Sequence, residues 1–210
     1  ASSSEAGVTP NAVAAAALIW SGAVNGTWDT TTTNWLNAGA AAKFQNGSVA
    51  IFDDSAQVNS TISLSANYSP GNVIFNNSAR TYSISGSSIA GSGSLVKQSG
   101  GSLTLNNAST FSGGATISGG QVTVGNNTAL GTGTITLSGG TLFGGGSGCT
   151  LANPIQIQTN TATTIDCSAN FTLNGNLSGG GTITRSASAT LSLYLGGNNS
   201  GFTGTYQDEN

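Results

Sequence analysis

The stretch SGGQVTVGNNTALGTGTITLSGGTLFGGG, residues 118–146, decides the fold because it repeats itself. The segment ISGGQVTVG (117–125), which overlaps its start, recurs twenty residues later as LSGGTLFGG (137–145). A third copy, QSGGSLTLN (98–106), precedes the first by nineteen residues. Each copy joins a glycine pair to a short run of alternating apolar residues. A period near twenty residues with this pattern is typical of a β-solenoid.

The alternation argues against the other interpretation of this composition, a flexible linker. Linkers and disordered segments carry few apolar side chains, whereas hydrophobic residues make up 37% of this chain. In a solenoid, each short strand pairs with its equivalent one coil further on, about 4.8 Å away. The glycines supply positive φ at the corners. The side chains expected to stack inward are Leu103, Leu105, Val122, Val124 and Leu142.

The same layout continues on both sides of this stretch. Downstream, IQTNTATTIDC (157–167) keeps the step of twenty, with extra residues before its second strand. Upstream, VIFNNSARTYSIS (73–85) fits the same two-strand layout with a slightly longer step. The sequence therefore predicts an all-β chain that forms a single right-handed parallel β-helix.

The first quarter of the chain breaks the repeat. Residues 19–54 contain all three tryptophans, and a solenoid needs a cap over its terminal coil. We expect a leader or first strand over 1–18, a Trp-rich cap over 19–54 and the β-helix over 55–210. Trp20, Trp28 and Trp35 fit two interpretations, burial in the cap or sugar stacking by at least one ring. Trp28, inside NGTWDT, looks like a loop tip and is the one expected to be exposed.

The charge and cysteine content limit the classes of binding partner and the cellular compartment that fit this chain. Charged residues are only 5% of the 210-residue chain, its net charge is −3 and it has no His. Such a surface has no basic field, which argues against nucleic acid and anionic membranes. The longest apolar run, at 12–20, is too short to span a bilayer. Cys149 and Cys167 lie eighteen residues apart, close to one coil, so we expect a disulfide formed in an oxidising compartment.

The ionisable residues do not form a catalytic set. A glycoside hydrolase needs two carboxylates across the scissile bond. Here Asp53 and Asp54 are adjacent, so in a strand they face opposite ways, and three of the seven acids lie near the termini. A serine nucleophile lacks a histidine base, and two thiols without His do not make a zinc site. We expect no enzyme activity, cofactor or metal; calcium at 53–55 stays open as an alternative to a polar turn.

Strand parity suggests a binding face instead. With Val122, Leu142 and Ile165 inward, Phe143 and Asp166 point outward on successive coils. With Leu193 inward, the same parity puts Tyr194 on that face, and an adjacent strand offers Gln156 and Gln158. A ladder of one strand per coil is close to the repeat of an extended β-linked sugar chain. The alternatives are a covered Phe143, an ordinary surface tyrosine, a hydrogen-bonded corner at Asp166 and an outward glutamine ladder.

Residues 91–143, GSGSLVKQSGGSLTLNNASTFSGGATISGGQVTVGNNTALGTGTITLSGGTL, resemble the autotransporter-associated β-strand repeat, with a weaker echo at 177–206. That repeat occurs in passenger domains of secreted bacterial proteins, which implies a secreted, extracellular or cell-surface location. In size and composition the whole chain also resembles the small β-helical carbohydrate-binding modules attached to bacterial xylanases.

These resemblances give two functional expectations. The first is a non-catalytic, monomeric carbohydrate-binding module that binds plant cell-wall polysaccharide, with xylan as the ligand, and targets a glycoside hydrolase domain of the same parent chain. The choice of xylan comes from the resemblance and not from the residues. The alternative is a structural or adhesive passenger segment of an autotransporter-like bacterial surface protein.

Overall fold

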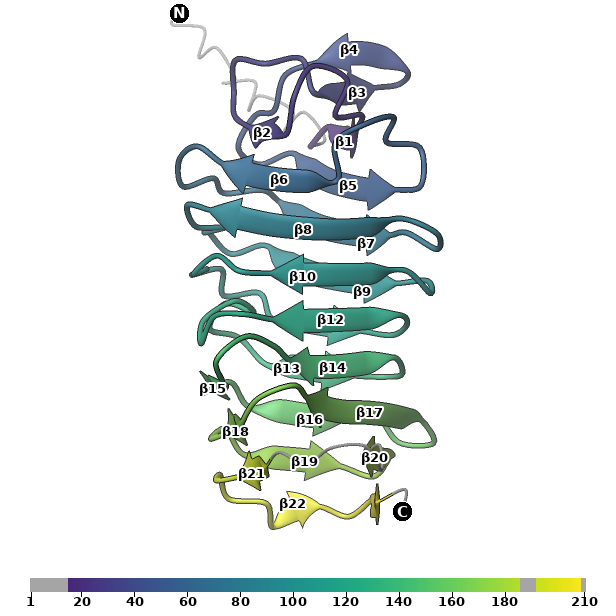
Figure 1. The fold of residues 1–210 in the computed structure, drawn as a ribbon, viewed down its shortest axis with the longest axis vertical. Coiled ribbons are helices and arrows are strands. Elements are labelled where there is room, and N and C mark those ends of the chain that lie inside the picture. The colour runs from purple at the N-terminus through teal and green to yellow at the C-terminus, as the bar shows by residue number, and fades with distance from the viewer. Residues whose placement is uncertain (1–14, 186–191, 209–210) are drawn as a thin grey trace, which may run out of the picture.

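A computed structural model describes residues 15–185 and 192–208, and over these residues the chain is all-β. The strands stack in about seven coils along one axis and form a β-solenoid (Figure 1). No helix occurs in the described residues, and hence none that could cross a membrane. The parallel β-helix predicted from the repeat is confirmed.

The largest sheet has eleven strands and runs the whole length of the solenoid. From the N-terminal end its strands are β4 (Ala40–Ala42), β3 (Trp35–Asn37), β1 (Ala17–Trp20), β5 (Val49–Asp53), β7 (Asn72–Asn76), β9 (Ser94–Gln98), β11 (Ala115–Ile117), β13 (Ile135–Leu137), β16 (Ile155–Ile157), β19 (Leu177–Gly179) and β22 (Gly201–Phe202). All neighbours from β1 to β22 are parallel, whereas β3 pairs antiparallel with both β1 and β4.

A nine-stranded parallel sheet forms a second side. Its strands are β2 (Thr27–Trp28), β6 (Thr61–Leu64), β8 (Thr81–Gly86), β10 (Ser102–Leu105), β12 (Gln121–Val124), β14 (Thr141–Gly144), β17 (Ala162–Cys167), β20 (Thr182–Arg185) and β23 (Thr205–Asp208). A short third sheet is added in the C-terminal half and contains β15 (Cys149–Leu151), β18 (Phe171–Leu173) and β21 (Leu193–Leu195).

The sequence period corresponds to one coil. Ile117 pairs with Leu137, and Gln121 pairs with Thr141, each twenty residues on. Gly120, at the corner between β11 and β12, has φ +64° and lies so close to the backbone of Gly101 that a Cβ would collide with it. Only glycine satisfies both demands, which explains the glycine pairs of the repeat.

Inward side chains from the sheets fill the solenoid in columns. All five predicted inward residues are fully buried: Leu103, Leu105, Val122, Val124 and Leu142. In the eleven-stranded sheet one column runs Phe52, Phe75, Lys97, Ile117 and Leu137 in register. Because equivalent residues of successive coils lie directly over one another, the core is continuous along the axis.

An aromatic cluster closes the N-terminal end of this core. Trp20, Trp28, Trp35, Phe44 and Phe52 are all fully buried. The rings of Trp20 and Trp35 meet edge to face at 5.0 Å between centroids, and Trp28 meets Phe44 in the same way at 5.0 Å. The hairpin of β3 and β4 lies above β1 at this end of the molecule (Figure 1). The Trp-rich segment thus covers the first coil.

Lys97 interrupts the apolar column and is fully buried. Its Nζ donates hydrogen bonds, both at 2.7 Å, to the carbonyl oxygens of Gln98, the last residue of β9, and of Ser99, which follows it. Burial lowers the pKa of Lys97 to about 8, because the charged ammonium loses its hydration. Keeping Lys97 charged at neutral pH therefore lowers the free energy of unfolding of the protein.

The stability of the wild-type protein relative to Lys97→Met should depend on pH. A lysine in the unfolded chain has a pKa near 10.4. Between about pH 8 and 10 the unfolded state therefore binds more protons at Lys97, and wild-type stability rises with pH. Lys97→Met lacks this rise, so its free energy of unfolding relative to wild type should fall by up to about 1.4 kcal/mol per pH unit.

Urea denaturation of both proteins between pH 7 and pH 9.5 measures this difference. The buried Tyr82 and the two cysteines also titrate at alkaline pH, but they are present in both proteins and cancel in the comparison. A difference in unfolding free energy that stays constant over this range would show that Lys97 titrates normally in the folded state.

Candidate functional site

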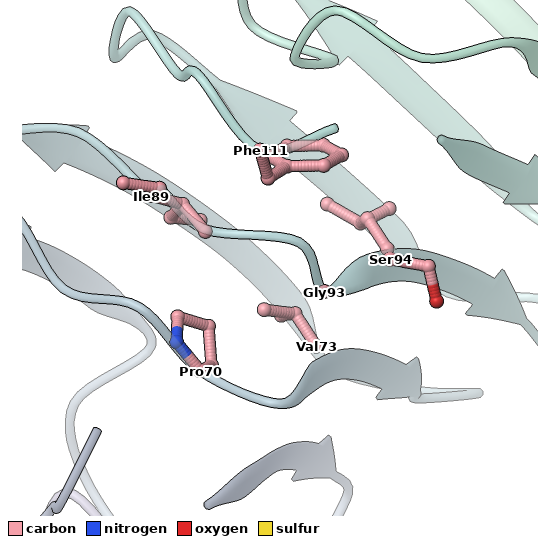
Figure 2. A pocket seen from close by; sticks show the side chains of 8 residues that line it. Pro70, Val73, Ile89, Gly93, Ser94 and Phe111 are labelled. Carbon is pink, nitrogen blue, oxygen red and sulfur yellow. The ribbon is translucent and has the colours of Figure 1, made fainter. Parts of the chain in front are cut away.

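One apolar gap lies between successive coils in the described part of the chain, and it is too small for a ligand. The apolar gap between Pro70, Val73, Ile89 and Phe111 has no volume for a water-sized molecule (Figure 2). A surface hollow of about 310 Å³ lies at the N-terminal end, and its lining, which includes Ala16, Lys43 and Gln45, contains none of the predicted site residues. The predicted site residues line neither space, so the outer faces of the sheets are the candidate binding surface.

The outer face of the nine-stranded sheet carries two columns of polar side chains. Alternate residues of each strand point outward and stand in register with those of the next coil. The first column is Thr81, Ser102, Gln121, Thr141, Thr164 and Thr184; the second is Ser83, Thr104, Thr123, Phe143 and Asp166. The columns lie about 7 Å apart, and each repeats about every 4.8 Å along the axis.

Phe143 is the one aromatic residue in these columns. It stands in register with Thr123 on one side and Asp166 on the other, as parity predicted, and it is half-buried. Beside it, the Gln121 side-chain amide donates a 3.0 Å hydrogen bond to the hydroxyl of Thr123. The ring thus sits in an ordered hydroxyl and amide surface on a rigid strand.

Asp166 does not extend this face as an accessible carboxylate. Its side chain is only 9% exposed, and its Oδ1 accepts the N–H of Cys167 at 2.8 Å. The strict alternation of β17 ends here, because Ile165, Asp166 and Cys167 are all buried where the strand reaches its corner. The burial and this hydrogen bond fit the alternative of a hydrogen-bonded corner, and the predicted sugar contact at Asp166 stays a prediction.

Tyr194 is exposed, at 51%, but lies on a different sheet from Phe143. It belongs to β21 of the three-stranded sheet and stands in register with Thr172. In the last coils the nine-stranded sheet is continued by β20 and β23 instead. Strand parity correctly predicted that the Tyr194 side chain points outward. It could not show that a third sheet is present in the C-terminal half, and this sheet puts Tyr194 on a different side of the solenoid from Phe143.

Gln156 and Gln158 are exposed, while Ile155 and Ile157 are buried, as predicted. Gln156 lies in β16 of the eleven-stranded sheet, between Thr136 and Ser178, and Gln158 directly follows that strand. The two amides therefore lie on another side of the solenoid and do not join Phe143 in one site.

The prediction that Trp28 is an exposed loop tip was wrong. Trp28 lies in β2, pairs with Leu64 of β6 and is fully buried. Its ring packs against Trp35, Phe44 and Phe52. The polar residues around it form the turn, while the ring fills the open end of the core. It is therefore a core residue and not a sugar-stacking platform.

Cys149 and Cys167 are free thiols, so the expected disulfide was also wrong. Cys167 stands in register with Gly144 of the nine-stranded sheet, whereas Cys149 stands in register with Phe171 of the three-stranded sheet. The two cysteines therefore occupy different sides of the coil. Eighteen residues are less than one coil here, because the third sheet lengthens the coils.

The carboxylates at 53–54 organise turns. Asp54 accepts hydrogen bonds from the backbone N–H groups of Ser78, Ala79 and Arg80 on the next coil, at 2.8, 3.1 and 2.9 Å. These bonds, that of Arg80 foremost, lower the pKa of Asp54. Asp53 accepts the N–H of Ser55. Both carboxylates act as the polar turn predicted as the alternative to calcium, and the described residues hold no cluster of three metal-ligating side chains.

Comparison with known proteins assigns no family to the chain: no family model matches it, and neither the curated proteins nor the solved structures contain a match.

The two cysteines should react as thiols without prior reduction. Both are buried, and burial raises the pKa of each thiol, so Ellman's reagent should react slowly with the native protein. After unfolding in denaturant, two thiols per chain should react at once, and none should react in a Cys149→Ser, Cys167→Ser double variant. Thiols that appear only after a reductant is added would mean that the disulfide forms.

Proposed function

We propose that this protein is a non-catalytic module that binds a neutral polysaccharide on the outer face of the nine-stranded sheet. One observation carries the proposal. In β8, β10, β12 and β14 the outward columns contain hydroxyls, one amide and the single half-buried ring of Phe143, and no charged residue. An uncharged surface of this kind matches an uncharged ligand that is rich in hydroxyl groups.

The chemistry of this face suits a sugar chain. The flat apolar side of a pyranose ring packs on an aromatic ring, while its hydroxyls exchange hydrogen bonds with threonine, serine and glutamine side chains. The face is held by inter-coil hydrogen bonds, so little ordering is needed on binding. A chain lying along the solenoid axis meets the same pair of columns on each successive coil.

The proposal extends to xylan of plant cell walls as the ligand and to a glycoside hydrolase domain in the same parent chain, secreted with this module. The support is the resemblance in size and composition to xylanase-associated β-helical modules, together with the absence of charged residues from the outward columns of β8, β10, β12 and β14. Binding without catalysis fits a surface on which no pair of accessible carboxylates flanks the ring.

One observation favours the second candidate, a structural or adhesive passenger segment. On the outer face of the eleven-stranded sheet, the N-terminal half carries an aliphatic column of half-buried side chains: Leu36, Ile19, Ile51, Ile74 and Val96. This column adds apolar contact along a rigid rod without forming a ligand pocket. A stalk of this kind gives no retention on polysaccharides, which separates it from the module.

Affinity electrophoresis in gels containing xylan, β-glucan, galactomannan or pectin tests the proposal. The wild-type protein should be retarded by xylan, and Phe143→Ala should weaken binding by about tenfold, because an aromatic contact contributes on the order of 1 kcal/mol beyond its buried area. Tyr194→Ala is the matched control, since it removes an exposed ring on another sheet. The module is excluded if the wild type migrates freely in every gel, and the face is misplaced if Tyr194→Ala alone abolishes retention.

A further inference from the structure

The third sheet begins partway along the solenoid, and its first strand leaves a step on the surface. β15 pairs with β18 on one side, and none of the described strands pairs with its other side. The loop 125–134, which joins β12 to β13 in the preceding coil, lies on that side. There the N–H of Thr150 in β15 donates to the Oδ1 of Asn127 at 2.9 Å. Figure 1 shows β15 away from both ends of the stack, so the step depends on neither end.

A hollow of about 150 Å³ lies at this step. Both coils line it, with Asn127, Thr128, Gly131 and Thr132 from the loop and Ala152 and Asn153 from the segment after β15. None of these residues is charged. The volume equals that of roughly five water molecules in the liquid. It holds one small ring, whereas pockets for drug-sized ligands start at about 300 Å³.

Asn153 holds a hydrogen-bond acceptor in a fixed position at the wall of the hollow. The residue is only 4% exposed. Its Nδ2 donates to the carbonyl oxygens of Gly131 and Gly133 at 3.1 and 2.8 Å, which uses both of its N–H groups. Its Oδ1 accepts no hydrogen bond from the described residues, and it is not among their enclosed polar atoms that lack a partner. Because Asn153 lines the hollow, this oxygen is an acceptor available to a ligand there.

The other polar side chains of the lining add one donor and two acceptors. Asn127 uses its Oδ1 for the contact with β15, and its Nδ2 donates to no group in residues 15–185 or 192–208. The hydroxyl of Thr128 donates to the Oδ1 of Asn126 at 3.2 Å, and that of Thr132 donates to the carbonyl oxygen of Phe111 at 3.4 Å. Each hydroxyl oxygen keeps lone pairs that can accept a hydrogen bond. The hollow thus presents three acceptors and one donor, without charge.

We propose that this hollow binds one unit of a neutral sugar. Each sugar hydroxyl both donates and accepts, so a single ring can satisfy three acceptors and one donor at the same time. The methyl group of Ala152 gives the apolar side of the ring a surface to pack on. A calcium ion takes about six to eight oxygen ligands with carboxylates among them, and this lining offers no carboxylate.

This site goes beyond the polysaccharide face and does not depend on it. None of the lining residues belongs to the two outward columns that contain Phe143. Asn127 and its neighbours in the loop lie past the end of β12, where the chain leaves the nine-stranded sheet. The hollow is therefore a second sugar site on the same chain, and its binding can be measured with the Phe143 ring removed.

Titration of the isotope-labelled 210-residue chain with D-xylose, D-glucose or D-galactose, followed by NMR, tests the proposal. With at least one sugar, the side-chain amide signals of Asn127 and Asn153 should shift together. The dissociation constant should be on the order of millimolar, because one ring buries little surface. No shift at either amide with any of the three sugars, up to about 100 mM, overturns the proposal. Retardation by xylan without these shifts would remove this site and leave the Phe143 face standing.

Ala152→Leu fills the hollow without removing a polar group, so it should weaken sugar binding by about tenfold or more. Ala108→Leu is the matched control, because it makes the same change at an exposed residue of the loop between β10 and β11 that does not line the hollow. Thr132→Val keeps the shape of the side chain and removes one acceptor, so it should weaken binding several-fold. The proposal fails if Ala152→Leu keeps wild-type affinity, or if Phe143→Ala abolishes the shifts, which would assign the sugar to the Phe143 face.

Discussion

In-register hydrogen bonding between successive coils is the constraint on which the rest of this structure depends. Parallel pairing places each residue directly over its counterpart, and the two-residue period of a strand keeps the whole column on one face. A slip of one residue would turn the column of Leu103, Val122 and Leu142 out to solvent. The same register turns Thr123 and Phe143 outward. The filled interior and the flat outer faces are two consequences of one pairing rule.

That rule also sets what could be predicted from the sequence. Between 98 and 145 the coils differ in length by one residue, so period and alternation gave the correct columns and the outward position of Phe143. Beyond 145 a third strand enters each coil, and Thr141 pairs with Thr164, twenty-three residues on. Spacing then no longer shows which residues lie over one another, and this explains the errors at Cys149 and Tyr194. The prediction for Trp28 failed for another reason. Covering the open end of the core is a requirement of the tertiary structure, and it overrides the turn-like composition of the local sequence.

A coil at the end of a solenoid has a neighbouring coil on one side only, so its inward side chains need another cover. The N-terminal end meets this demand with a cluster of fully buried rings beneath an antiparallel hairpin.

Departures from the column pattern are therefore the positions at which structure and function can be told apart. Lys97 departs on the inside, where an apolar residue is expected, and the turn carbonyls of Gln98 and Ser99 take up its ammonium. The ammonium of Lys97 is thus hydrogen-bonded within the fold, which indicates a structural role for this residue. Phe143 departs on the outside, where hydroxyls stand on the preceding coils, and the register needs no ring there. An aromatic side chain that stands outside the core, next to the hydroxyl of Thr123, is the observation that supports the proposed polysaccharide-binding face.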